Sequence, residues 1–367
     1  MSTQFEVFTS MADASESTMR AIVKKGPEQG VDIRSDIAEP KSVPAGHVKV
    51  KVSAASVCGT DKGIYDYTSA AAAFNLRLPV IMGHEGSGKV VEAGEGISNI
   101  EVGDPVAFDS HIACKSCYQC NNDAPHLCEN MLLLGLHIDG LFAEYAIVPV
   151  QAVFKLPEGF NLEEAALLEP AGVGMHALQA YGESVLGKRV VITGGGPVGL
   201  FIAELARLGG AAKVVVVEPN PYRRSFAESL GAVSIEPGPD VPAQLRAMSS
   251  DRKGFDVGFE ASGHPSSFQA ISDSLRVGGT YVSVGFGRSS GEFDGAEYLN
   301  RRNLTYRGSF GRRLWSTWDN LSVLIAEGRL NLSKFITHRL PLSDFERAIE
   351  LLSQDSCKVL LVPDLDQ

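Results

Sequence analysis

The first third of the chain consists of short apolar segments that are interrupted by glycine, proline and aspartate, a pattern that predicts strands and turns rather than long helices. Turns are indicated at residues 92–96 and 102–104. Because the connections are irregular, we expect a partly open barrel. The predicted strands are Met19–Lys25, His47–Ala54, Gly88–Ala93 and Pro105–Phe108.

The pattern changes near Asn161 to helical spacing, and from Arg189 onward strands and helices alternate. Such alternation is typical of a parallel, doubly wound α/β sheet. Helices are predicted at Leu162–Leu168 and Val173–Tyr181, followed by the strands Arg189–Thr193, Lys213–Val217, Asp256–Glu260 and Gly279–Phe286 and the helices Pro197–Leu208, Pro221–Leu230 and Ser267–Leu275. The last predicted elements are the helices Thr317–Glu327 and Leu342–Ser353, an extended segment near Phe335–Arg339 and the strand Lys358–Val362.

Length and composition are those of a globular protein with two cores. The chain has 367 residues, of which 44% are hydrophobic and 21% charged. No apolar run approaches the roughly 18–20 residues that span a bilayer, and the net charge of −11 argues against nucleic acid or a membrane as the main partner. The polar residues 1–18 lack the features of a secretory signal, so we expect a disordered extension and a cytoplasmic protein.

A glycine-rich turn separates the predicted strand Arg189–Thr193 from the helix that follows it. Gly194, Gly196 and Gly199 have the spacing G-x-G-x-x-G, which permits a tight turn, close approach of a pyrophosphate and close packing of helix on strand. The helix N-terminus then favours an anion. The expected cofactor contacts in this turn are Gly194, Gly196, Pro197, Val198 and Gly199.

Cofactor choice is expected to depend on Glu218, at the end of the second strand of this unit. A carboxylate there accepts hydrogen bonds from the ribose hydroxyls and repels a 2′-phosphate, which favours NAD over NADP. Arg223 and Arg224 follow in the next helix. They could meet a 2′-phosphate or lie in solvent.

Four of the six cysteines fall close together, in the pattern C-x-x-C-x-x-C-x7-C. Four thiolates can fill the tetrahedral coordination of one zinc ion and leave no position for water, so this site would be structural. An iron–sulfur cluster and four unrelated thiols are the alternatives. The residues are Cys114, Cys117, Cys120 and Cys128.

A second metal site is indicated by Cys58-Gly59-Thr60-Asp61 and by Gly83-His84-Glu85. A catalytic zinc requires about three protein ligands and one open position. Cys58 and His84 are suitable donors, and either Glu85 or Glu169 could complete the set. Taken singly, residues of these types are more often structural.

Together these motifs resemble those of the zinc-containing medium-chain dehydrogenases, and the resemblance extends over almost the whole chain from Met19. It is closest to L-threonine 3-dehydrogenases and to sorbitol-type polyol dehydrogenases, through segments such as His126-Leu127-Cys128, Gly311-Arg312-Arg313-Leu314-Trp315 and the stretch from Glu169 to His176. The resemblance implies a GroES-like catalytic domain at 19–170 and 312–367, with a zinc lobe at about 111–130, and a Rossmann domain at 171–311.

The resemblance further implies a homodimer or homotetramer with two zinc ions per chain that oxidises a secondary alcohol with NAD. The small-molecule substrate would be a polyol, a sugar or a 3-hydroxy amino acid such as L-threonine. Thr60 would pass the hydroxyl proton to the nicotinamide ribose, and His111 and His137 could line the substrate side. Gly263, Val284, Gly285 and Phe286 would lie along the cofactor.

One position departs from the pattern of the family. Many members have a histidine five residues after the catalytic cysteine, where this chain has Gly63, so the proton must leave by another route. Two other classes of protein remain as alternatives: a zinc-free NADPH reductase, expected to lack Cys58 and His84, and a non-catalytic binding protein on the same fold.

Overall fold

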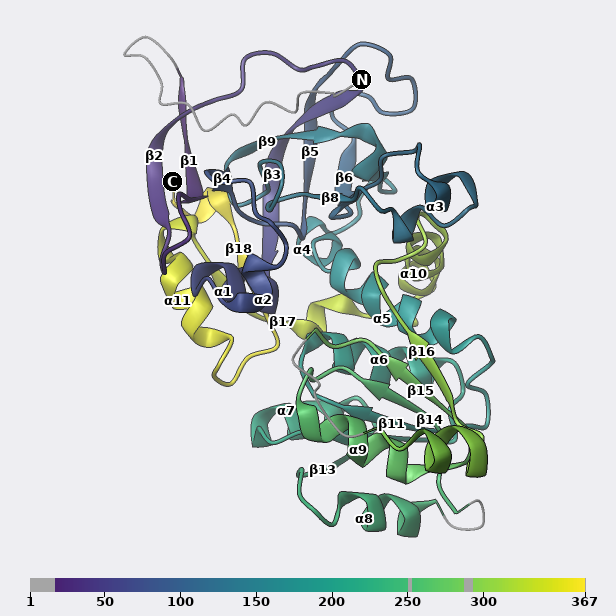
Figure 1. Ribbon diagram of the computed structural model, residues 1–367. Coiled ribbons are helices and arrows are strands. Elements are labelled where there is room, and N and C mark those ends of the chain that lie inside the picture. Colours follow the sequence, from purple (N-terminus) through teal and green to yellow (C-terminus); the bar gives the residue numbers. More distant parts are fainter. Residues whose placement is uncertain (1–16, 250–252, 287–292, 367) are drawn as a thin grey trace. The chain divides into compact units, whose positions relative to one another are not determined.

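The computed structural model describes residues 17–249, 253–286 and 293–366, and the chain divides into two compact units (Figure 1). Unit 1 comprises Met1–Glu169 and Asn331–Gln367, and unit 2 comprises Pro170–Leu330. Most of the expected N-terminal extension, residues 1–16, lies outside the described residues.

The chain returns to unit 1 later than the expected boundary at residue 312. The reason is that the helix α10 (Ser316–Ala326) packs within unit 2, where Trp318 is fully buried. A Cβ atom on Gly172, in the helix α5 (Leu168–Tyr181), would lie 2.9 Å from Arg312 Cδ and 3.6 Å from Trp318 Nε1. Residues 312–330 therefore belong to the core of unit 2.

Unit 1 is built on two antiparallel-rich sheets, which confirms the expected β-rich domain. The first has three strands in the order β2-β1-β4, and the second has seven, in the order β10-β6-β5-β3-β18-β17 with β9 paired to β3. Their bounds are β1 Thr18–Lys24, β2 Asp32–Ala38, β3 His47–Val57, β4 Val80–Ile81, β5 Gly86–Ala93, β6 Pro105–Phe108, β9 Tyr145–Pro149, β10 Val153–Lys155, β17 Ile336–Leu340 and β18 Lys358–Leu361. The short helices are α1 Gly59–Tyr65, α2 Ser69–Ala72, α3 Tyr118–Asn121, α4 Leu162–Ala165 and α11 Phe345–Leu351.

Strand β3 organises the core of unit 1, because alternate residues point into it. Val48, Val50 and Val52 are fully buried and belong to one apolar cluster with residues of β5, β6 and β18. The strand pairs with β9 in its first half, with β5 along most of its length and with β18 at its end, so its C-terminal end is fixed by β5 and β18. The residue that follows this fixed end is Cys58.

Unit 2 contains a six-stranded parallel sheet in the order β13-β12-β11-β14-β15-β16, as the strand–helix alternation predicts. The strands are β11 Arg189–Thr193, β12 Lys213–Val217, β13 Val233–Ile235, β14 Phe255–Glu260, β15 Leu275–Ser283 and β16 Thr305–Gly308. The helices are α6 Pro197–Leu208, α7 Pro221–Ser229, α8 Val241–Met248 and α9 Pro265–Ser274. Because the strands are parallel, their C-terminal ends meet at one edge of the sheet, where doubly wound folds bind ligands.

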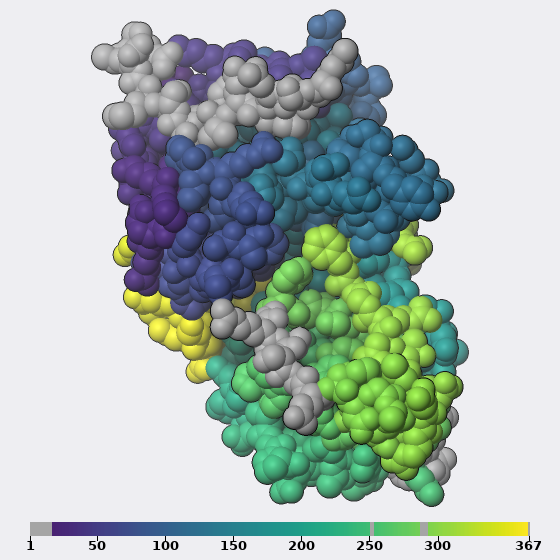
Figure 2. Space-filling view, in the orientation of Figure 1, coloured from purple at the N-terminus to yellow at the C-terminus, as the bar shows by residue number. Residues whose placement is uncertain are grey.

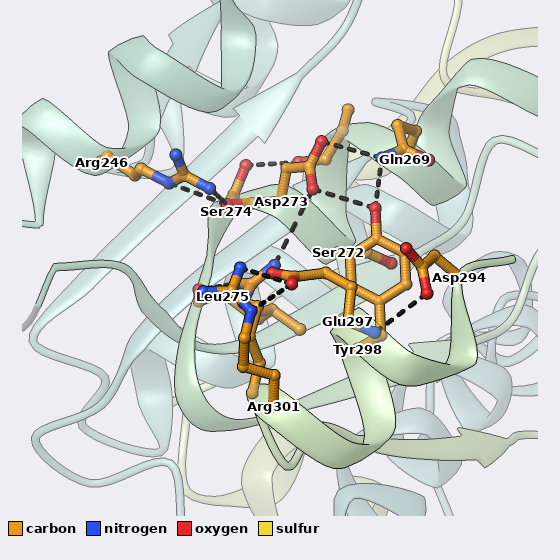
Figure 3. Close-up of polar contacts among 12 residues, drawn as sticks. Arg246, Gln269, Ser272, Asp273, Ser274, Leu275, Asp294, Glu297, Tyr298 and Arg301 are labelled. Carbon is orange, nitrogen blue, oxygen red and sulfur yellow. Dashed lines mark hydrogen bonds and ion pairs between the residues drawn. The ribbon is translucent and has the colours of Figure 1, made fainter.

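A polar cluster around Asp273, at the end of α9, stabilises the packing of this unit (Figure 3). Its carboxylate accepts hydrogen bonds from Gln269 Nε2 at 2.9 Å and from Tyr298 Oη at 3.0 Å, and its carbonyl oxygen accepts one from Arg246 Nε at 2.9 Å. Asp273 thus joins α9 to α8 and to the π-helical turn Ala296–Arg301. No helix among the described residues is long and apolar enough to cross a membrane.

Candidate functional site

Three candidate metal ligands lie together in unit 1. Ligand atoms of Cys58, His84 and Glu85 are all within 4.8 Å of one another. Cys58 lies between the end of β3 and the start of α1, whereas His84 and Glu85 lie between β4 and β5. Since β5 pairs with β3, the sheet brings the two segments together. A thiol, an imidazole and a carboxylate are the donors that zinc prefers.

Asp61 orients two of these three ligands. It is fully buried, its Oδ2 accepts a hydrogen bond from Cys58 N at 2.8 Å, and its Oδ1 lies 3.3 Å from His84 Nδ1. Burial is the largest single effect on the pKa of His84 and lowers it, but the charge and hydrogen bond of Asp61, together with those of Cys58, raise the pKa well above its usual value. A buried position that attracts a proton in this way fits a cation, and a carboxylate behind a ligating histidine is a common feature of zinc sites.

Lys358 contacts the third ligand and is a residue that sequence analysis missed. Its ammonium donates hydrogen bonds to Glu85 Oε2 at 2.5 Å and to the carbonyl oxygen of Val57 at 3.1 Å. Both side chains of the ion pair are only 2% exposed. Burial is the largest single effect on the pKa of Lys358 and lowers it, but the attractions of Glu85 and of the neighbouring cysteines together raise the pKa overall, so the lysine remains charged.

Glu169 lies outside the group formed by Cys58, His84 and Glu85. Its Oε1 accepts a hydrogen bond from Ser110 Oγ at 2.8 Å. The same hydroxyl lies 3.1 Å from His111 Nδ1, which is 3.2 Å from Asp109 Oδ1. Glu169 therefore belongs to a buried polar chain. Of the two carboxylates considered as the third metal ligand, Glu85 is the one that lies with Cys58 and His84.

Thr60 and Gly63 occupy the first two turns of α1. The Thr60 side chain is half-buried, and its hydroxyl makes no hydrogen bond to another described residue. A Cβ atom on Gly63 would meet Thr68 Oγ1 at 3.4 Å, an ordinary contact. Thr60 therefore keeps a free hydroxyl two residues from Cys58.

His137, suggested for the substrate side, contacts backbone groups through both of its ring nitrogens. Its Nδ1 accepts a hydrogen bond from Leu133 N at 2.9 Å, and its Nε2 lies 2.8 Å from the carbonyl oxygen of Phe74. Both ring nitrogens are thus occupied in the neutral form, and burial lowers the pKa of this histidine. These contacts favour a structural role for His137.

The four clustered cysteines form a second group of candidate metal ligands in unit 1. The sulfur atoms of Cys114, Cys117, Cys120 and Cys128 lie within 4.8 Å of one another, and those of Cys117 and Cys128 are 3.9 Å apart. Zinc–sulfur bonds of about 2.3 Å in a tetrahedron require sulfur–sulfur separations of about 3.8 Å. The arrangement therefore fits one zinc ion with four thiolates and no open position.

The cysteine lobe is closed at its base by β7 (His111–Ile112) and β8 (Leu132–Leu133), which pair in antiparallel register, and it lies at the surface of unit 1 (Figure 2). Hydrogen bonds from Ser116 and Cys117 lower the pKa of Cys114 to about 5, whereas burial raises that of Cys128 to about 12. In the absence of metal the lobe thus contains both thiolates and thiols.

The glycine-rich turn of unit 2 has the shape expected of a pyrophosphate cradle. Gly194 has a φ of +93°, and a Cβ atom there would lie 2.8 Å from Ser262 N. A Cβ atom on Gly199 would lie 1.9 Å from the carbonyl oxygen of Gly194, whereas one on Gly196 would meet nothing within 4 Å. Gly196 faces open space at the N-terminus of α6, and Pro197 and Val198 form its first turn. This fits the pyrophosphate of a dinucleotide.

Glu218 follows β12 directly and is held beside this turn. Its Oε2 accepts a hydrogen bond from Gly195 N at 2.6 Å, and its Oε1 accepts one from Asn220 N at 2.9 Å. Arg224 donates hydrogen bonds to the carbonyl oxygens of Glu218 and Pro219, at 2.8 and 2.6 Å. The Arg224 guanidinium is thus held by these two backbone carbonyl oxygens. Arg223 lies half-buried in the first turn of α7.

The remaining predicted cofactor residues meet at the ends of β14 and β15, around the buried Glu260. Its Oε1 accepts hydrogen bonds from Ser262 N at 2.7 Å and Gly263 N at 2.9 Å. Its carbonyl oxygen accepts hydrogen bonds from Val284 N at 2.8 Å and Gly285 N at 2.7 Å, and Phe286 is exposed. The sequence predicted Glu260 only as the last residue of a strand, whereas in the structure it holds two predicted cofactor segments together.

Comparison with known proteins identifies the family. Residues 44–158 match the alcohol dehydrogenase GroES-like domain, and residues 197–327 match the zinc-binding dehydrogenase domain. L-threonine 3-dehydrogenase from Pyrococcus furiosus is 38% identical over 336 residues, which cover 91% of this chain and 95% of that relative. The chain belongs to the zinc-binding alcohol dehydrogenase family.

Solved structures agree with this assignment. The 2R,3R-butanediol dehydrogenase from Bacillus subtilis superposes with a TM-score of 0.83 at 31% identity, covering 94% of this chain and 99% of that one. A zinc-binding dehydrogenase from Sinorhizobium meliloti, bound to NADP, gives a TM-score of 0.84 at 28% identity, covering 95% and 100%. The expected fold class, a GroES-like domain with a Rossmann domain, is confirmed.

Proposed function

We propose that this protein is an enzyme that oxidises a secondary alcohol and transfers the hydride to NAD. The observation that carries the proposal is the buried group of Cys58, His84 and Glu85, oriented by Asp61 and carried by the same chain as a glycine-rich dinucleotide turn. Zinc, when bound, acts as a Lewis acid that lowers the pKa of a hydroxyl group, and NAD accepts the hydride.

The residues of the chain have separate roles in this reaction. Cys58 and His84 would hold the catalytic zinc with Glu85, and Asp61 fixes the orientation of the first two. Thr60 would relay the hydroxyl proton of the substrate, accepting it while passing its own proton to the nicotinamide ribose, because its hydroxyl is not engaged elsewhere among the described residues. The polar chain from Glu169 through Ser110 would orient the substrate side of this site.

We assign the cysteine lobe to a structural zinc. Four thiolates complete a tetrahedral site, so no position remains for a substrate. The expected composition is therefore two zinc ions per chain. A zinc-free NADPH reductase does not need the Cys58–His84–Glu85 group, which the structure assembles.

NAD is proposed over NADP because of Glu218. Its carboxylate lies beside the turn where the adenosine ribose would bind, and Arg224 is held by two carbonyl oxygens. A 2′-phosphate would therefore meet a negative charge. The relative from Sinorhizobium meliloti contains NADP, so the preference has to be measured for this chain.

The substrate class is proposed from the relatives and from the metal centre together. The names of two of them specify L-threonine and 2R,3R-butanediol as substrates, each a small secondary alcohol with a polar neighbouring group. Reduction of NAD and NADP should be screened with L-threonine, 2,3-butanediol, sorbitol, xylitol and aldoses. We expect at least one secondary alcohol to reduce NAD in preference to NADP. Failure of every alcohol with both cofactors would overturn the proposal.

We further propose a cytoplasmic homodimer or homotetramer. Thiols that serve as metal ligands persist in a reducing compartment, and none of the six cysteines forms a disulfide in the structure. Light scattering of the zinc-loaded protein tests the assembly, and cell fractionation tests the location. A monomer would contradict the proposed assembly, and secretion would contradict the proposed location.

A further inference from the structure

Strand β18 brings Lys358 to the back of the candidate catalytic metal site. It pairs with β3 in antiparallel register, Val359 opposite Val57, so Lys358 lies level with Cys58. The ammonium contacts the carbonyl oxygen of Val57, the residue before Cys58, and the carboxylate of Glu85. One buried cation thus touches both segments that supply the ligands.

Among the described residues, the side-chain hydrogen bonds of Glu85 are all made by one of its two carboxylate oxygens. Lys358 Nζ donates to Oε2 at 2.5 Å, and Ser56 Oγ donates to the same atom. The backbone is fixed as well, because Ser56 N donates to the carbonyl oxygen of Glu85 at 2.9 Å. Among the described residues no donor reaches Oε1. Oε1 is therefore the oxygen left for a metal ion.

Stability alone is a poor explanation for this ion pair. Transfer of an ammonium and a carboxylate from water to the interior is costly, and apolar residues of similar size often stabilise such a position equally well. The side chain of Lys358 is 2% exposed, and it sits among apolar residues of β18, such as Val359 and Leu360, that are fully buried. A charged residue nevertheless occupies this position, and its one side-chain partner among the described residues is a candidate metal ligand.

We propose that Lys358 is a positioning residue of the catalytic metal centre, which anchors Oε2 of Glu85 so that this carboxylate binds the metal through Oε1 alone. A carboxylate held in this way cannot turn to bind with both oxygens. It therefore leaves one coordination position open for a substrate hydroxyl. The inference rests on the proposed catalytic zinc site. It adds Lys358, which would limit Glu85 to one metal-binding oxygen.

The test compares zinc affinity in Lys358→Met, which keeps the length of the side chain and removes the charge, and in Lys358→Arg, which keeps a donor. Competition with a chelator measures the affinity of the purified full-length protein for the zinc ion held by Cys58, His84 and Glu85, called the second zinc below. We expect Lys358→Met to weaken it about 10–100-fold, the usual effect of losing an outer partner of a metal ligand, and Lys358→Arg to restore most of it.

Lys24→Met is the matched control. Lys24 is also a buried lysine of unit 1, and its ammonium is held by the carbonyl oxygens of Glu28, Gly30 and Tyr65 rather than by a ligand residue. We expect this variant to lower the melting temperature and leave zinc affinity unchanged. An equal loss of zinc affinity in Lys24→Met and Lys358→Met would mean general destabilisation and would overturn the proposal.

Two further measurements make the result specific. Glu85→Gln should weaken the same zinc, and adding Lys358→Met to it should cause little further loss, because the two residues act as a unit. In the cobalt-substituted protein, Lys358→Met should change the visible absorption bands, since cobalt bands follow coordination number, and the cysteine lobe is the same in both samples. If Lys358→Met does not fold, Ser56→Ala removes the other donor to Oε2 and should by itself weaken zinc binding.

Unchanged or tighter binding of the second zinc in Lys358→Met, or unchanged binding in Ser56→Ala, would overturn the inference. Cys58→Ser separates this failure from a failure of the proposed function. If Cys58→Ser lowers the zinc content from two to one while Lys358→Met leaves the second zinc untouched, only the role of Lys358 is wrong. If Cys58→Ser keeps both zinc ions, the catalytic metal site itself is wrong.

Discussion

Oε2 of Glu218 accepts a hydrogen bond of 2.6 Å from the backbone N–H of Gly195, so the residue after β12 is fixed against the glycine-rich turn after β11. Asn220 N holds the other oxygen at 2.9 Å. The carboxylate is therefore oriented before any cofactor binds, with lone pairs left for ribose hydroxyls. The proposed preference for NAD would thus be a property of the preformed loop.

Glu218→Ala should raise the KM for NAD by about tenfold or more, since a hydrogen bond to a charged group contributes on the order of 1.5–3 kcal/mol. It should also narrow the advantage of NAD over NADP, because the repulsion of a 2′-phosphate is removed. Initial rates with both cofactors measure this effect. Glu183→Ala, at an exposed carboxylate elsewhere in unit 2, is the control and should leave both constants unchanged. A wild-type preference for NADP would contradict the assignment.

Cys117→Ser removes one of the four sulfur ligands of the lobe. We expect zinc content to fall from two to one per chain and the melting temperature to fall, because metal binding contributes folding free energy in such loops. Turnover per remaining catalytic zinc should change little. Cys357→Ser, at a buried cysteine outside both groups, should keep two zinc ions. Full zinc content in Cys117→Ser would mean that the lobe is not a metal site.

Zinc binding to the lobe should release protons. Burial raises the pKa of Cys120 and, to about 12, that of Cys128, whereas hydrogen bonds lower the pKa of Cys114 to about 5. At pH 7 the metal-free lobe therefore holds at least two protonated thiols, and zinc must displace their protons when it binds. The affinity of the lobe for zinc should consequently fall as the pH falls. Calorimetry of zinc binding in buffers of different ionisation enthalpy counts these protons. Release of fewer than one proton would contradict the pKa values of the buried thiols.

Thr60→Ala should lower turnover by about 100-fold, the usual scale for a positioned proton-transfer group, without change in zinc content. Thr60→Ser keeps the hydroxyl and should be much milder. Because Gly63 supplies no imidazole, the acid limb of the wild-type pH profile should lack a histidine-like pKa from that position. Pre-steady-state rates of the two variants across pH test this route. Near-normal turnover of Thr60→Ala would favour a direct water path for the proton.

Local sequence signals were sufficient for the centre of unit 2. The predicted bounds of β11, α6 and β12 agree with the structure, because the β-branched run of β11 ends at Gly194, a proline begins α6, and the valine run of β12 ends at the polar Glu218. The four-cysteine lobe was equally visible, since its ligands are close in sequence. In both cases, the interactions that define the feature are local.

Other features depend on contacts between distant segments. Lys358 and Glu85 are far apart in sequence, and only the pairing of β18 with β3 brings them together. The choice between Glu85 and Glu169 as the carboxylate beside Cys58 and His84 likewise required the pairing of distant strands, here β3 with β5. Strands β2 and β9 were missed because they carry polar residues or follow irregular loops, and their pairing rather than their composition defines them.

The most direct test of the whole account is the zinc content of wild type and Cys58→Ala, measured on the same samples as NAD reduction by a secondary alcohol found in the substrate screen. The account predicts two zinc ions per chain and alcohol-dependent NAD reduction for wild type, and one zinc ion and no measurable reduction for Cys58→Ala. A wild-type protein that reduces NAD with a single zinc in the cysteine lobe, or a Cys58→Ala variant that turns over at the wild-type rate, would contradict it.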